Sequence, residues 1–134
     1  MLYADTDNIL RCCRFDAEKS LWTKENMDGP GFPDVVLHPS SRIAGVLTTS
    51  GVMVFFQNPG CVIECIQYDA QSTLWKRGFA VPGASAESTP LCTFLTDNSL
   101  VVSYVGEDKR MHCHTRDFET GNWTGMSVYD WNIV

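Results

Sequence analysis

Asp16-Ala-Glu-Lys-Ser-Leu-Trp22 is the first of three related segments in this chain. It recurs as Asp69-Ala-Gln-Ser-Thr-Leu-Trp75 and as Asp117-Phe-Glu-Thr-Gly-Asn-Trp123. The tryptophan follows the aspartate by six residues each time, and the aspartates lie 53 and then 48 residues apart. A period of this length is typical of arrays of small supersecondary units, so the sequence predicts a repeat protein.

Short strands flank each segment, and the middle repeat shows the complete unit. Four strands are predicted there, separated by turn residues: Ile43–Leu47, Val52–Gln57, Val62–Tyr68 and Leu74–Ala80. No window has a convincing helical period. Four antiparallel strands repeated at this spacing describe one blade of a β-propeller. A β-sandwich with accidental internal similarity is the alternative.

The chain is therefore predicted to be all-β and to form a single, partial propeller domain over residues 1–134, with about 2.7 blades of about fifty residues. The blade units are expected at approximately residues 1–34, 41–83 and 89–130. The first lacks a strand equivalent to Ile43–Leu47. Because propellers use roughly four to eight blades, we expect a second copy to complete the ring as a homodimer, or the chain to be a piece of a longer propeller.

Charge and hydropathy exclude some partners. The formal net charge is -6 and the basic residues are scattered, which argues against nucleic acid. The longest apolar stretches are strand-sized and too short to span a bilayer, so no membrane contact is expected. The N-terminal residues have neither a basic start nor an apolar core. No signal peptide is predicted, and a cytoplasmic location is expected.

Three of the six cysteines, Cys12, Cys65 and Cys113, occupy the same position in successive repeats. Residues in separate blades lie too far apart for a disulfide, whose Cα atoms are within about 7 Å, so free thiols are predicted. His112 and His114 flank Cys113, but alternation along a strand sends them to the opposite face. We therefore predict no metal site and no cofactor.

Two strands and a turn carry a family resemblance: Val52-Met-Val-Phe-Phe-Gln57 and Val62-Ile-Glu-Cys65, followed by Tyr68-Asp69 and Trp75. Over nearly its whole length the chain resembles the fungal and bacterial fucose-binding lectins of the Aleuria aurantia lectin type. The resemblance implies a six-bladed propeller built from one chain or by oligomerisation. It also implies sugar sites between blades, each with an arginine from a second strand, a glutamate from a third strand and aromatic residues from a neighbouring blade.

On this resemblance, Glu64 occupies the glutamate position of the middle repeat and Met53 the arginine position. The same two positions hold His112 and Val101 in the third repeat, and the glutamate position of the first repeat holds Arg11. No repeat keeps the full polar set. The candidate ligand-binding residues are Glu64, Met53, Tyr68, Trp22, Trp75 and Trp123.

These candidates have structural interpretations as well. Glu64 can be a salt-bridged surface residue, the three tryptophans can pack the blades, and His112 and His114 can belong to a solvated strand. The aspartates Asp16, Asp69 and Asp117 are predicted to cap turns.

Three functions remain open from the sequence. The first hypothesis is a lectin-like propeller that binds a carbohydrate, fucose or a related sugar. The second is a small-molecule isomerase or cyclase of the natural-product type, with Glu64, His112 or His114 as acid–base residues. The third is a protein-interaction scaffold. Common enzyme motifs such as GxSxG, a P-loop or HExxH are absent.

Overall fold

The computed structural model describes residues 1–27, 32 and 34–128, which form three antiparallel sheets. The first sheet contains β1 (Leu2–Ala4), β2 (Leu10–Asp16) and β3 (Leu21–Glu25). The second contains β4 (Ile43–Thr48), β5 (Gly51–Gln57), β6 (Ile63–Asp69) and β7 (Leu74–Ala80). The third contains β8 (Leu91–Leu95), β9 (Ser99–Val105), β10 (Met111–Asp117) and β11 (Trp123–Val128). The all-β prediction is confirmed, and the four strands predicted for the middle repeat agree with the structure to within one residue.

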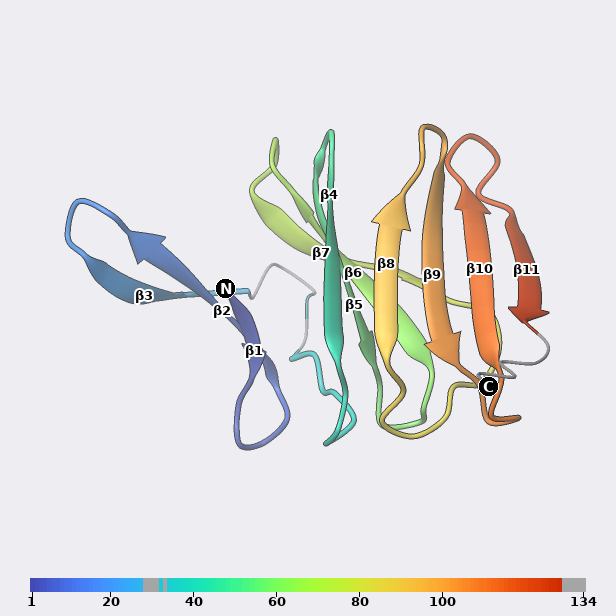
Figure 1. The fold of residues 1–134 in the computed structure, drawn as a ribbon. Helices are drawn as coiled ribbons and strands as arrows, with labels where there is room; N and C mark the ends of the chain where they lie inside the picture. Colours follow the sequence, from blue (N-terminus) through green and yellow to red (C-terminus); the bar gives the residue numbers. More distant parts are fainter. Residues whose placement is uncertain (28–31, 33, 129–134) are drawn as a thin grey trace.

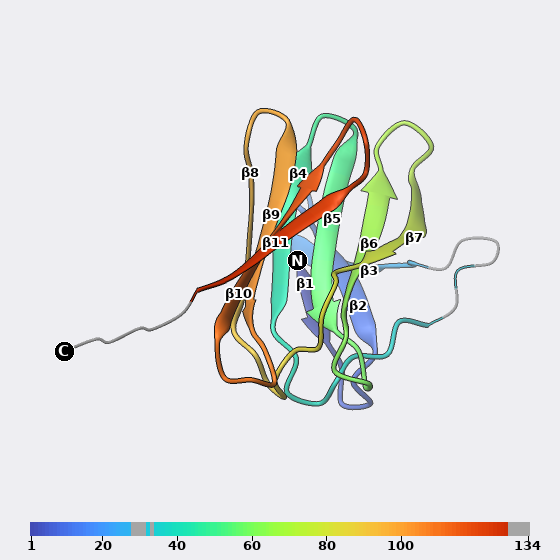
Figure 2. The same cartoon turned by 90° about the vertical axis from the view of Figure 1, so that its right-hand side faces the viewer.

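The sheets follow one another as the blades of a partial propeller do (Figure 1). Within each sheet the strands are neighbours in chain order, and β4 contacts β8, so the first strands of the second and third sheets adjoin. Figure 2 shows these two sheets from the side, with β1–β3 behind them. The first sheet has no described strand equivalent to β4. The segment that follows β3 contacts this sheet, through a hydrogen bond from the Leu10 N–H to the Val35 carbonyl (2.9 Å).

The same two turns recur in every sheet. The predicted aspartates cap the turn between the last two strands: the Asp69 carboxylate accepts the Gln71 N–H (2.9 Å), and Asp117 accepts the Thr120 N–H (2.7 Å). These bonds lower the pKa of both carboxyl groups. The preceding turn places Asn8, Cys61 and Lys109 in the left-handed region, with φ of 59°, 59° and 62°. These three positions are 53 and 48 residues apart, the same spacings as in the sequence repeat. The repeat in the sequence is therefore also a repeat of backbone conformation.

Alternation gives each sheet two faces, which we name by chain order. The leading face of the second sheet, with Val54, Phe56 and Ile66, packs against the first sheet. Its trailing face, with Phe55 and Ile63, packs against the third sheet. The contact between the first and second sheets is the first seam, and that between the second and third sheets is the second seam. At each seam, the trailing face of one sheet meets the leading face of the next.

A buried amide anchors the linker after β7. Gln57 is 1% exposed, and its Nε2 donates to the Ser85 hydroxyl (2.7 Å) and the Ala86 carbonyl (2.8 Å). Its Oε1 accepts the Ser88 N–H (3.2 Å). This network joins β5 to the chain that leads into the third sheet, and so fixes the second seam.

All six cysteines are described, and each is a free thiol. No helix in the described part of the chain is long and apolar enough to cross a membrane. Among the same residues, no group of three or more His, Cys, Asp or Glu side chains could hold a metal ion. The predicted blade boundary at residue 130 lies outside the described residues.

Candidate functional site

A cleft of about 530 Å³ opens at the first seam. Its volume lies in the range of small-molecule sites, about 300–1,000 Å³. One wall comes from β6 and β7 of the second sheet and the other from β2 and β3 of the first. Val52 of β5 and Leu2 of β1 add apolar surface.

Aromatic side chains form the wall on the second sheet. Strand pairing sets Tyr68 opposite Trp75 on the leading face, with ring centroids 5.2 Å apart and planes at 52°. Trp75 packs partly against the buried core of the first seam, while both rings line the cleft. The pair is therefore held firmly and presents an apolar platform to the opening.

The opposite wall carries charge. Arg14 of β2 and Glu25 of β3 form an ion pair, with 2.9 Å between Nε and Oε1. Their side chains are 75% and 37% exposed, so both keep hydrogen-bonding atoms open to a ligand. Cys12 lies beside them, and burial raises the pKa of its thiol, which favours the protonated form. The cleft thus sets an aromatic platform against a donor and an acceptor.

Glu64 and Met53, expected in one site, are not brought together. Glu64 pairs with Phe56 and Met53 with Gln67, so their side chains lie on opposite faces of the second sheet. Glu64 stands four residues from Tyr68, about 13 Å along the strand, and does not line the cleft. It accepts a hydrogen bond from Asn58 (2.8 Å) and pairs with Arg77 (3.3 Å). Its contacts are those of a salt-bridged residue.

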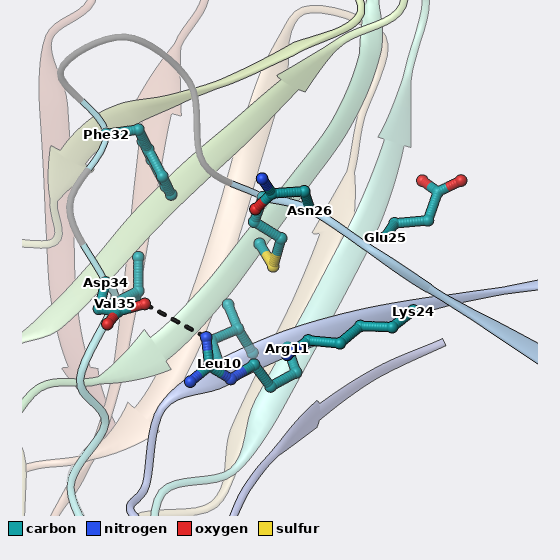
Figure 3. Close-up of a pocket in the computed structure, with 9 residues that line it drawn as sticks. Leu10, Arg11, Lys24, Glu25, Asn26, Phe32, Asp34 and Val35 are labelled. Atoms are coloured by element: carbon teal, nitrogen blue, oxygen red, sulfur yellow. Dashed lines mark hydrogen bonds and ion pairs between the residues drawn. The ribbon is translucent and has the colours of Figure 1, made fainter.

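Arg11, at the corresponding position of the first sheet, is also engaged within the chain. Its guanidinium contacts Asp5 at 2.8 Å and Asp34 at 3.2 Å. The pKa of Asp5 is lowered, first by the Ile9 N–H and then by Arg11. Figure 3 shows Arg11 and Asp34 beside a pocket of about 60 Å³, into which Phe32 points. That volume suits a few water molecules and not a sugar ring.

The second seam is filled where the first is open. Trp123, at the position of Trp75, packs edge-on against Phe79 (5.6 Å), and Arg116, at the position of Tyr68, lies over the Phe79 ring (4.4 Å). Gln67 and Gly78 replace Arg14 and Glu25. Trp123 is therefore a packing residue in this seam.

His112 and His114 also belong to the second seam. Their rings are stacked parallel to that of Tyr104, with centroids 5.5 and 5.6 Å from it. His112 pairs with Asp108 (2.9 Å), and burial lowers the pKa of His114. Because Glu64 faces the first seam, the three acid–base candidates do not share a cleft.

The remaining predicted residue, Trp22, lies in the first sheet. It forms a pair with Phe15 whose geometry repeats that of Tyr68 and Trp75, 5.2 Å and 52°, and both rings line the rim of the cleft. Tyr68, Trp22 and Trp75, which the sequence predicted as candidates, line this cleft, and so do Arg14 and Glu25, which were not among the predicted residues. The register of the β2–β3 hairpin could have pointed to both residues. Arg14 lies two residues after Cys12, on the same face of the strand, and Glu25 pairs with Cys12.

Three blade-like sheets and two seams define the chain as part of a β-propeller. Its fold is similar to that of SapL1 lectin solved with alpha methyl fucoside (TM-score 0.71, 20% identity), covering 95% of this chain and 41% of that one. AofleA from Arthrobotrys oligospora is also similar, with a TM-score of 0.69 and 16% identity, over 93% of this chain and 37% of that one. Its triple arginine-to-alanine mutant has a TM-score of 0.70 and 16% identity, over 95% of this chain and 38% of that one. The chain thus spans about two fifths of the length of these structures. No protein-family model and no curated protein matches it.

Proposed function

We propose that the chain is a lectin-like module that binds a carbohydrate in the cleft at the first seam. One observation carries the proposal: the Tyr68–Trp75 platform faces the Arg14–Glu25 pair across an open cleft of about 530 Å³. The likeness in fold to a lectin adds support from outside the chain.

A sugar ring has the chemistry that this arrangement fits. Its C–H faces are apolar and stack on aromatic rings, while its hydroxyls both donate and accept hydrogen bonds. A guanidinium offers only donors and a carboxylate only acceptors, so Arg14 and Glu25 together can bind two adjacent hydroxyls. Their charges cancel, which favours a neutral sugar over an acidic one.

Fucose or a related deoxy sugar is the first ligand to test. Alpha methyl fucoside is the ligand solved with SapL1 lectin, and a methyl group in place of a polar arm would suit the apolar floor formed by Leu2 and Val52. Arg14 is the arginine among the residues that line the cleft, and it forms an ion pair with Glu25.

Arg14→Gln tests the proposal, with Arg77→Gln as its matched control. Both arginines are exposed and ion-paired to a glutamate, but Arg77 does not line the cleft. Loss of a charge-assisted hydrogen bond costs about 1.5–3 kcal/mol, so Arg14→Gln should weaken binding about ten- to hundredfold. A glycan array followed by calorimetry on the best sugar gives the measurement. Equal weakening by both variants, or by Arg77→Gln alone, would place the site elsewhere.

A further inference from the structure

The second seam contains a histidine at a position where the first seam has a core isoleucine. Ile66 and His114 are equivalent residues of successive leading faces, 48 residues apart. Ile66 is 0% exposed in the first seam, whereas His114 is partly buried in the second. Of these two side chains, the imidazole alone can take up a proton near neutral pH. The equivalent positions therefore differ in how the packing of their seams responds to acid.

Tyr104 sets the tautomer of neutral His114. Its hydroxyl lies 2.6 Å from the Pro82 carbonyl, which accepts hydrogen bonds and donates none, so the hydroxyl proton points there. The His114 Nε2 atom lies 3.3 Å from the same hydroxyl oxygen and therefore donates to it. This hydrogen-bond chain joins the third sheet to the linker after β7. Further protonation of His114 takes place at Nδ1, beside the backbone of Gly125.

A second histidine stands at a position that holds a turn in every sheet. Two residues before His114 and its equivalents, a polar side chain bonds to the turn that precedes its strand. The pairs are Arg11 with Asp5 (2.8 Å), Glu64 with Asn58 (2.8 Å) and His112 with Asp108 (2.9 Å). The hydrogen bond from His112 is the main cause of the lowered pKa of Asp108. The same turn carries three other charged residues, all exposed: Glu107, Lys109 and Arg110. The carboxylate of Asp108 thus balances one imidazolium, that of His112.

Positive groups gather around His114 within the seam. The His112 ring centroid is 6.2 Å from that of His114, and Arg116 follows two residues later on the same face. The other groups that face this part of the seam include six neutral ones: Tyr104 of β9, Trp123 of β11, Phe55 of β5, Cys65 of β6, Phe79 of β7 and Gly83 of the linker. Burial raises the pKa of Tyr104, and raises that of Cys65 to about 12, so neither becomes an anion near neutral pH. A charged His114 therefore meets repulsion and apolar surroundings.

We infer that the second seam is an acid-sensitive joint, in which protonation of His114 loosens the contact between the second and third sheets and leaves the first seam closed. With His112 and Arg116, a charged His114 places three positive charges along one strand face against an apolar sheet. Water stabilises these charges better than the closed seam does, so a hydrated, open seam is favoured in acid. The core and cleft of the first seam contain no histidine among their described residues. This joint is independent of the sugar binding proposed above.

The sign and size of the response follow from proton linkage. Burial, and then the charge of His112, lower the pKa of His114 in the closed seam below its usual 6.5, so opening takes up a proton. The closed seam is therefore fully stable above about pH 6.5 and loses stability as the pH falls below it. Opening should increase by up to about a factor of ten for each unit by which the pKa is lowered.

Amide hydrogen exchange followed by NMR at about pH 7.5 and pH 5.5 tests the joint, after correction for intrinsic exchange rates. The Ala86 N–H joins the linker after β7 to the third sheet, through the Val105 carbonyl. At the first seam, the Leu37 N–H joins the linker after β3 to the first sheet, through the Asn8 carbonyl. Acid should increase opening at Ala86 and leave Leu37 unchanged. No increase at Ala86, or an equal increase at both amides, would overturn the inference.

Variants of His114 identify the group responsible. His114→Ile copies the residue of the first seam, and His114→Gln keeps a side-chain donor without a titratable ring. Both should abolish the acid response at Ala86, whereas His38→Gln, at a histidine of the linker between β3 and β4, should retain it. If neither His114 variant folds, His112→Gln replaces them and should reduce the response, because it removes one cause of the lowered pKa. A wild-type response in a folded His114 variant, or in His112→Gln where it replaces them, would show that His114 is not the switch.

Discussion

Glu64→Ala and Glu25→Ala distinguish the site expected from the sequence from the cleft proposed above. Glu64 is held by Asn58 at 2.8 Å and by Arg77 at 3.3 Å, with 29% of its side chain exposed. Removing it deletes one hydrogen bond and one partly exposed ion pair, together about 1 kcal/mol. For a chain of this size, that lowers the Tm by about 3–5 °C. Sugar affinity should stay within about twofold, because Glu64 does not line the cleft.

Glu25→Ala should show the opposite pattern. Its partner Arg14 is 75% exposed and remains hydrated when Glu25 is removed, so stability should change by less than about 1 kcal/mol. The lost acceptor should cost about 1.5 kcal/mol of binding free energy, the low end for a charged group because Glu25 is partly exposed, or about tenfold in Kd. Calorimetry and thermal unfolding on both variants separate the two effects. A tenfold loss of affinity in Glu64→Ala with wild-type binding in Glu25→Ala would refute the assignment of the cleft.

Two further predictions concern the second seam. Gln57→Leu should destabilise the chain by about 2–4 kcal/mol in urea unfolding, because the Ala86 carbonyl and the Ser88 N–H lose a buried partner, whereas Gln67→Leu, at a partly exposed site, should have little effect. Burial, and then the charge of His112, lower the pKa of His114 below its usual 6.5. The unfolded chain therefore takes up the proton first, so stability should be full above about pH 6.5 and decrease below it. His114→Gln should flatten that decrease in Tm measured from about pH 8 to pH 5, and an unchanged slope would contradict this assignment.

Much of the fold could be predicted because the same residue types recur at the same turns of each repeat. Each Asp-to-Trp segment contains a turn that is capped by its aspartate and ends in the strand after that turn. The capping hydrogen bonds join residues only two or three positions apart, so they can be predicted from the local sequence. The positive-φ residues were not predictable in the same way. Asparagine is a residue type that tolerates a left-handed backbone, as at Asn8. Cysteine and lysine do not favour that conformation, yet Cys61 and Lys109 have the same φ. Their conformation is imposed by the strands on either side.

The site was harder to predict, because it depends on which face a residue occupies. The family resemblance put Met53 and Glu64 in one site, but the residue numbers of paired residues in this hairpin sum to 120, so Glu64 shares its face with even-numbered residues. A difference of one residue therefore moves a side chain to the other seam. Tyr68 and Trp75 were found because they are directly paired and the repeat marks both of them. Arg14 and Glu25 occur in only one repeat, so the periodicity does not mark them.

One backbone irregularity contributes to the difference between the two seams, together with the residue replacements described above. In the first sheet Cys12 pairs directly with Glu25, and the carboxylate reaches the cleft. In the second sheet the register between β6 and β7 shifts between Glu64 and Ile66, as a β-bulge does. Gly78 then lies so close to Cys65 that a Cβ would meet its carbonyl oxygen at 3.0 Å, and Phe79 packs against Phe55 (6.1 Å) and Trp123. The bulge thus puts the Phe79 ring in the second seam where the first seam has the exposed carboxylate of Glu25. The second seam therefore has aromatic packing where the first has an open cleft.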